Sequence, residues 1–218
     1  MATPSPTPSP TPQQPVRLVP QVEEHPAVPA ANPSLVGLPS FVVGAVTVGM
    51  VSIGVVPATA IGASMPIVLA AAVGMFIATI WAARIGESVP AGISAIVGSF
   101  LLSYALLVLG LLHNWFGIAP TAVASTEKVF LISWIAVVSV LILATLRLPV
   151  VYTFLFAVVD VALIVKLLSV IQTSENLNKA SGWILMAVAA IVVYLFFGAA
   201  SAATGGKEVP LGPPILHT

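Results

Sequence analysis

The chain has 218 residues, of which 59% are hydrophobic and only 6% are charged, and its formal net charge is zero. Soluble domains carry about 25% charged residues, so this chain lacks the polar surface that a water-soluble protein needs. The zero net charge argues against nucleic acid as a partner. The sequence contains no cysteine, which excludes disulfides and thiolate catalysis.

Residues 1–31 differ in composition from the rest of the chain. They begin with a Pro/Ser/Thr repeat from Thr3 to Pro12, which favours extended polyproline II and cannot pack a core. We expect a disordered N-terminal tail, with a docking arm for a soluble partner as the alternative. The first 40 residues show no apolar run between a charged segment and a cleavage site, so no cleaved signal peptide is expected.

Apolar runs then fill most of the chain, near 35–56, 60–83, 89–112, 129–146, 149–171 and 181–203. Each is long enough for a hydrocarbon core of about 30 Å, which takes roughly 20 helical residues. The runs lack the alternation of barrel strands, so they predict an all-α membrane protein with six transmembrane helices. This domain covers 32–203, and a short C-terminal tail follows at 204–218. The connecting turns are expected at 57–64, 84–88, 113–127, 147–148 and 172–180.

The Lys and Arg residues of the short connections predict the orientation in the membrane. One side would carry Arg17, Arg84, Arg147 and Lys207, and the other Lys128 and Lys179. The excess places both termini in the cytoplasm, in a multi-pass protein of the plasma membrane. Glycines within the runs are expected to serve close helix packing, because small residues let helices approach each other in lipid.

Two ionisable residues, Asp160 and Lys166, fall well within a predicted span. Asp160 lies near the bilayer midplane, where a charge is costly, so its side chain should face protein, a partner or water. It is either a group that couples proton and solute movement or a protonated carboxyl bonded across a helix interface. Lys166 lies about 240° further round the helix, on another face. Its ammonium either snorkels to the interface or faces a vestibule, where it would concentrate anions.

Catalytic and cofactor motifs are missing from the sequence. It contains neither H-E-x-x-H, G-x-S-x-G, a P-loop nor G-x-G-x-x-G. Its three histidines, His25, His113 and His217, lie outside the predicted spans, which argues against a histidine metal site. We therefore expect no enzyme activity, no cofactor and no metal.

Several short segments resemble, in order and spacing, the acetate/succinate transporter family (AceTr, also called the GPR1/FUN34/YaaH family). The first is Asn32-Pro33-Ser34-Leu35-Val36-Gly37-Leu38, followed by Phe41, which is similar to the family's N-P-x-P-L-G-L signature. Leu35 and Val36 replace proline and leucine of that signature. The other segments are Gly86-Glu87-Ser88 with Gly98-Ser99-Phe100, Ser181-Gly182-Trp183 with Tyr194, and Gly206-Lys207-Glu208-Val209-Pro210-Leu211-Gly212.

The resemblance implies six-helix protomers in a ring-shaped homo-oligomer, a hexamer, with a narrow path through each protomer for acetate-like small carboxylates. It places Asn32, Pro33, Ser34, Leu35, Gly37 and Leu38 at the mouth of that path. It places the constriction at Phe41, Val97 and Val159, of which the two valines are smaller than their counterparts and predict a wider constriction. Asp160 follows directly, so either it is protonated or the solute is not a free carboxylate.

Two functions remain open from the sequence. One is a transporter or channel for acetate-like monocarboxylates in the bilayer, with Asp160 as the candidate for proton coupling. The other is an accessory membrane subunit whose Pro-rich tail binds a partner.

Overall fold

A computed structural model of the chain describes residues 32–207 and 209–216. The tail predicted at 1–31 lies outside the described residues. The described part is built on α1 (Ser34–Ile53), α2 (Ile61–Arg84), α3 (Ser88–Leu112), α4 (Val123–Thr145), α5 (Val150–Gln172) and α6 (Glu175–Ala203). All six helices are long and apolar enough to cross a membrane, which confirms the predicted number of spans.

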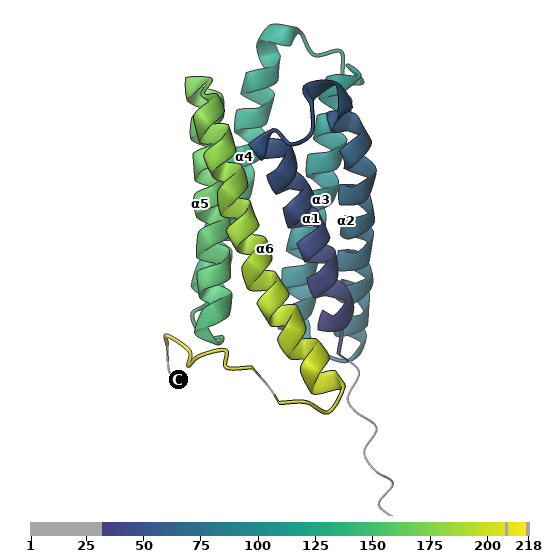
Figure 1. Cartoon of the computed structure of the whole chain (residues 1–218), viewed down its shortest axis with the longest axis vertical. Helices are drawn as coiled ribbons and strands as arrows, with labels where there is room; N and C mark the ends of the chain where they lie inside the picture. The colour runs from purple at the N-terminus through teal and green to yellow at the C-terminus, as the bar shows by residue number, and fades with distance from the viewer. Residues whose placement is uncertain (1–31, 208, 217–218) are drawn as a thin grey trace, which may run out of the picture. The chain divides into compact units, whose positions relative to one another are not determined.

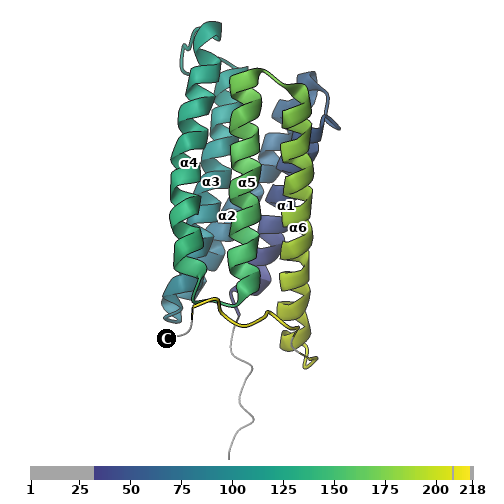
Figure 2. The ribbon, with the colours of Figure 1, turned by 90° about the vertical axis from the view of Figure 1, so that its left-hand side faces the viewer.

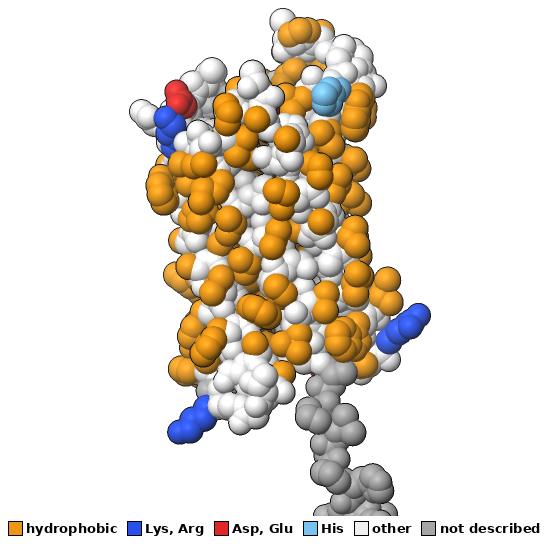
Figure 3. Space-filling view, turned by 45° about the vertical axis from the view of Figure 1, so that its right-hand side comes forward, with side chains coloured by type: hydrophobic (Ala, Val, Ile, Leu, Met, Phe, Trp, Pro, Cys, Tyr) orange, Lys and Arg blue, Asp and Glu red, His pale blue; other side chains and the backbone are white. Residues whose placement is uncertain are grey.

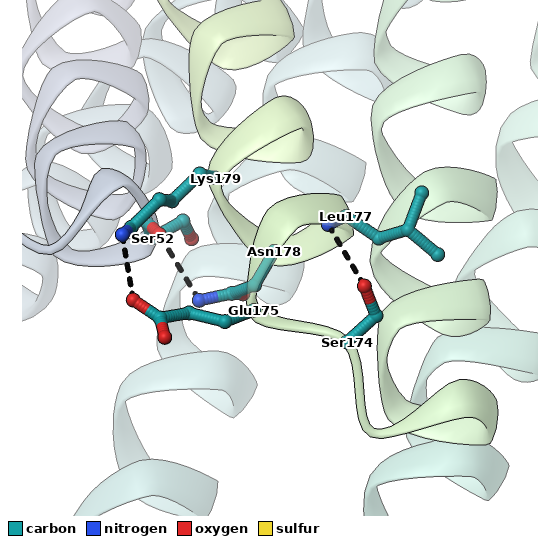
Figure 4. Close-up of polar contacts among 6 residues, drawn as sticks. All are labelled: Ser52, Ser174, Glu175, Leu177, Asn178 and Lys179. Atoms are coloured by element: carbon teal, nitrogen blue, oxygen red, sulfur yellow. Dashed lines mark hydrogen bonds and ion pairs between the residues drawn. The ribbon is translucent and has the colours of Figure 1, made fainter.

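Two helices begin earlier than predicted. The α4 helix starts at Val123, after a 3-10 turn, and α6 starts at Glu175, so residues assigned to turns belong to helices. At α6 the cause is local: the Ser174 side chain accepts a hydrogen bond from the Leu177 backbone N–H and caps the first turn. Figure 4 shows this cap. The first turns of both helices carry polar residues, and hydropathy alone places such turns outside a span.

The helices neighbour one another in the order α4, α5, α6, α1, α2, α3 (Figures 1 and 2). Aromatic side chains link α4 and α3, the first and last helices of this order. Phe100 and Tyr104 of α3 pack against Phe130 and Trp134 of α4, with the Phe100 and Trp134 rings edge to face at 5.4 Å. The bundle is thus closed between α3 and α4 by aromatic side chains, and an interior space is left behind them.

Helices α1 and α6 approach each other closely at two glycines. A Cβ atom at Gly182 would lie 2.7 Å from the carbonyl oxygen of Gly49, and one at Gly49 would lie 3.2 Å from that of Gly182. The expectation that glycines serve packing is met at these positions. Because lipid offers no hydrophobic drive between helices, such contact is a main source of helix association.

The described part of the C-terminal segment packs back onto the bundle. The hydroxyl of Tyr194 donates to the Pro210 carbonyl at 2.7 Å, and the backbone N–H groups of Val150 and Val151 donate to Pro213 and Leu211. Two segments singled out in the sequence, the one containing Tyr194 and the one containing Pro210, are therefore in contact. The segment joins the end of α6 to the turn between α4 and α5.

The outer surface has the pattern of a membrane protein. On the face in Figure 3, hydrophobic side chains cover the middle, and charged side chains lie near the two ends. Exposed apolar residues include Val129, Ile132, Val140 and Leu143 of α4. A soluble monomer rarely exposes so many together.

The glycine contact gives a test of packing. Gly182→Ala is expected to lower the unfolding free energy by about 1–3 kcal/mol, because its methyl group must push α6 away from α1. Gly92→Ala in α3 is the matched control, since an added Cβ there would meet no atom within 4 Å beyond its chain neighbours and the backbone of its own helix. Replacing Gly by Ala within a helix raises the unfolding free energy by about 0.5–1 kcal/mol. Thermal unfolding in detergent measures both, and equal midpoints would contradict the packing role.

Candidate functional site

Three of the cavities bounded by the described residues follow one another through the bundle. The mouth cavity, about 210 Å³, is bounded by Ser34, Leu38, Ser94 and Tyr152. The constriction is a space of about 40 Å³, and Phe41 and Phe156 line both of these cavities. The third, the polar vestibule, measures about 360 Å³ and shares its inner wall with the constriction. The shared residues are Val48, Phe100, Leu163 and Leu185. The cavities therefore form a series from one end of the bundle to the other.

Four of the six motif residues that the resemblance assigns to the mouth of a path line the mouth cavity, and that role stays a prediction. The lining of this cavity includes Pro33, Ser34, Gly37 and Leu38. The other two predicted residues, Asn32 and Leu35, do not belong to that lining. The side-chain oxygen of Asn32 instead accepts a hydrogen bond of 2.9 Å from the Ser34 backbone N–H, which orders the start of α1. This contact with the backbone thus gives a local structural role to Asn32, the first residue of the motif.

The three residues that the resemblance assigns to a constriction line one small cavity, and their role in narrowing a path stays a prediction. Phe41 comes from α1, Val97 from α3 and Val159 from α5, and all three line the same small cavity. Its other walls include Trp134, Val138 and Phe156. Because this lining is apolar, a charged solute at this point loses hydration without gaining a hydrogen bond.

The polar vestibule has a different chemistry. Its lining includes six polar side chains, from Ser52, Tyr104, Glu127, Lys166, Asn178 and Ser181. The Lys166 ammonium donates to the side-chain oxygen of Asn178. The amide nitrogen of Asn178 in turn donates to the Ser52 carbonyl at 3.0 Å, as Figure 4 shows. Three helices, α1, α5 and α6, therefore hold the ammonium in place.

Lys166 thus takes the second of its two predicted positions, in a vestibule. Glu127 and Asn178 were not among the predicted site residues, because their polar surroundings in the sequence indicate turns. One signal was present for Asn178: Ser174 followed by Glu175 and, four residues later, Lys179 is a typical helix start. A helix from Glu175 puts Asn178 in its first turn.

Asp160 lies apart from the three cavities and contributes to none of their linings. The hydroxyl of Ser139 on α4 donates to its Oδ2 at 3.1 Å. Its Oδ1 is buried and has no hydrogen-bond partner among the described residues. The carboxyl therefore joins α4 to α5, and Asp160 and Lys166 do occupy different faces of α5. A role in proton coupling stays a prediction.

This contact leads to a stability prediction. Ser139→Ala is expected to lower the unfolding free energy by about 1–3 kcal/mol, because the Asp160 carboxyl loses a hydrogen bond inside the membrane. In the control, Ser133→Ala, the lost hydroxyl bonds only the Val129 carbonyl of its own helix. That control should change stability by less than about 0.5 kcal/mol. Identical unfolding temperatures for the two variants would argue against the interhelical bond.

Comparisons with known proteins give a family and a structural neighbour. The sequence model of the GPR1/FUN34/yaaH family matches residues 16–207. The structure is similar to one titled "Structure of the bacterial acetate channel SatP", with a TM-score of 0.72 and 21% sequence identity. The alignment covers 84% of this chain and 99% of that one. A sequence search of curated proteins gives no match.

Proposed function

The chain belongs to the GPR1/FUN34/yaaH family, and from this premise we propose that it is a membrane transporter or channel for acetate-like small monocarboxylates. The observation that carries the proposal is the series of cavities, with polar groups at both ends and an apolar constriction between them. Permeation needs binding that is weak enough for release, and few polar groups around a narrow apolar passage meet that need. The similarity to an acetate channel supports the choice of solute.

The path would join the polar vestibule to the mouth cavity by way of Val159, Val97 and Phe41. With both termini in the cytoplasm of a plasma-membrane protein, the polar vestibule faces outward and receives the solute first. The exposed apolar side chains of α4 supply a surface for lipid or for neighbouring protomers in a ring-shaped homo-oligomer, a hexamer by resemblance.

Uptake of labelled acetate into proteoliposomes tests the function directly. We expect uptake well above that of empty liposomes. Its absence would contradict transport and favour an accessory subunit. Acetate uptake is then measured with and without an inward proton gradient, since the gradient drives a proton-coupled carrier but not a passive channel.

The position of Asp160 outside the cavities favours a structural role, so Asp160→Asn should keep acetate uptake and its response to the gradient. A response lost in this variant alone would instead identify Asp160 as the coupling group.

Narrowing the constriction should block the path. Val97→Phe places a ring in a space of about 40 Å³ and is expected to reduce acetate flux at least tenfold. Val161→Phe is the matched control, because Val161 of α5 is 49% exposed on the outside of the bundle. Flux of the control should match wild type. Equal flux through both variants would mean that the solute does not pass Val97.

A further inference from the structure

The polar vestibule contains two opposite charges on different walls. Lys166 projects from α5 and Glu127 from α4, and both line the cavity. Within residues 32–207 and 209–216, the one ion pair joins Glu175 to Lys179, at 2.6 Å and outside the cavity. Lys166 and Glu127 therefore share a space without neutralising each other through direct contact. Charged groups at membrane depth that face a cavity are candidates for solute recognition.

The Lys166 ammonium is held in place and still has donors to offer. An ammonium carries three N–H donors, and one of them goes to Asn178. Asn178 is itself tied to the Ser52 carbonyl of α1, so its oxygen is oriented before a solute arrives. The remaining donors match the oxygens of a carboxylate, and such charge-assisted hydrogen bonds are stronger than neutral ones.

The size of the cavity does not select for acetate. A volume of about 360 Å³ falls at the lower end of the range of about 300–1,000 Å³ typical of ligand sites. A four-carbon acid with two carboxylates would fit as well as acetate. Any discrimination must then come from charge, and a carboxylate at Glu127 in the same lining would repel a second carboxylate of the solute.

We propose that Lys166 and Glu127 make the polar vestibule a selectivity site that accepts singly charged carboxylates and rejects dicarboxylates. Lys166 binds the ionised carboxylate of the solute. Glu127 acts against a second negative charge, which is specificity by repulsion of the wrong ligand. The aromatic side chains of Phe100 and Tyr104 face the same space and can receive the apolar end of a monocarboxylate. This proposal rests on the proposed transport function.

The test compares acetate and succinate flux in proteoliposomes at a series of concentrations. Lys166→Gln should raise the half-saturating acetate concentration about tenfold, and Lys166→Arg should largely restore the wild-type value. Glu127→Gln should raise the ratio of succinate to acetate flux about tenfold while acetate flux stays near wild type. Misfolding would lower the flux of both solutes, so it cannot produce this gain of succinate flux.

The matched controls are Lys179→Gln and Glu175→Gln. They make the same charge changes at exposed positions on α6, at the same end of the bundle. Both variants should leave the half-saturating acetate concentration and the ratio of succinate to acetate flux unchanged. An unchanged flux ratio in Glu127→Gln would overturn the proposal. So would a half-saturation value in Lys166→Gln equal to that of Lys179→Gln.

A binding measurement separates this proposal from transport itself. Acetate should raise the thermal unfolding temperature of purified wild-type protein, and the increase should be lost in Lys166→Gln but kept in Lys179→Gln. If wild type moves no acetate yet shows this pattern, transport fails and the acetate site at Lys166 stands. Stabilisation that is equal in all three proteins would overturn binding at Lys166.

Discussion

The close contact between α1 and α6 determines where the polar groups of the vestibule lie. Gly49 and Gly182 let the two backbones meet, and Asn178 stands one turn before Gly182 on the same helix. That position brings its amide within 3.0 Å of the Ser52 carbonyl. The amide oxygen is then oriented toward Lys166 on α5. The contact between the two glycines thus positions the Asn178 amide, and this amide in turn fixes the Lys166 ammonium in the cavity.

Much of the fold could be predicted from the sequence, because lipid allows few alternatives. Runs of about 20 apolar residues must be helices, since each backbone group has to find its partner within the segment. The three constriction residues required the resemblance as well, and Phe41, Val97 and Val159 do line one cavity. The number of helices was therefore accessible before the structure, and so was the grouping of these three residues, whose role as a constriction stays a prediction.

The polar vestibule could not be predicted from the sequence in the same way. Hydropathy ends a span where polar residues begin, although helices α4 and α6 continue through Glu127 and Asn178. The helical angle correctly separated Asp160 from Lys166, but an angle does not say which face meets a cavity. That depends on the neighbouring helices, and here α4 covers the Asp160 face while the Lys166 face borders the vestibule.

The two ionisable side chains of α5 lie differently with respect to the cavities, which matters for the passage of an anion. A fixed charge at an apolar constriction would either repel an anion or hold it too tightly for release. Here the carboxyl of Asp160, next in sequence to Val159, lines none of the three cavities and accepts a hydrogen bond from the Ser139 hydroxyl. The ammonium lies beyond the constriction, in a cavity wide enough for water and solute. In the proposed function, recognition at Lys166 and passage at Val97 occupy separate places, so the strength of binding can change without altering the width of the path.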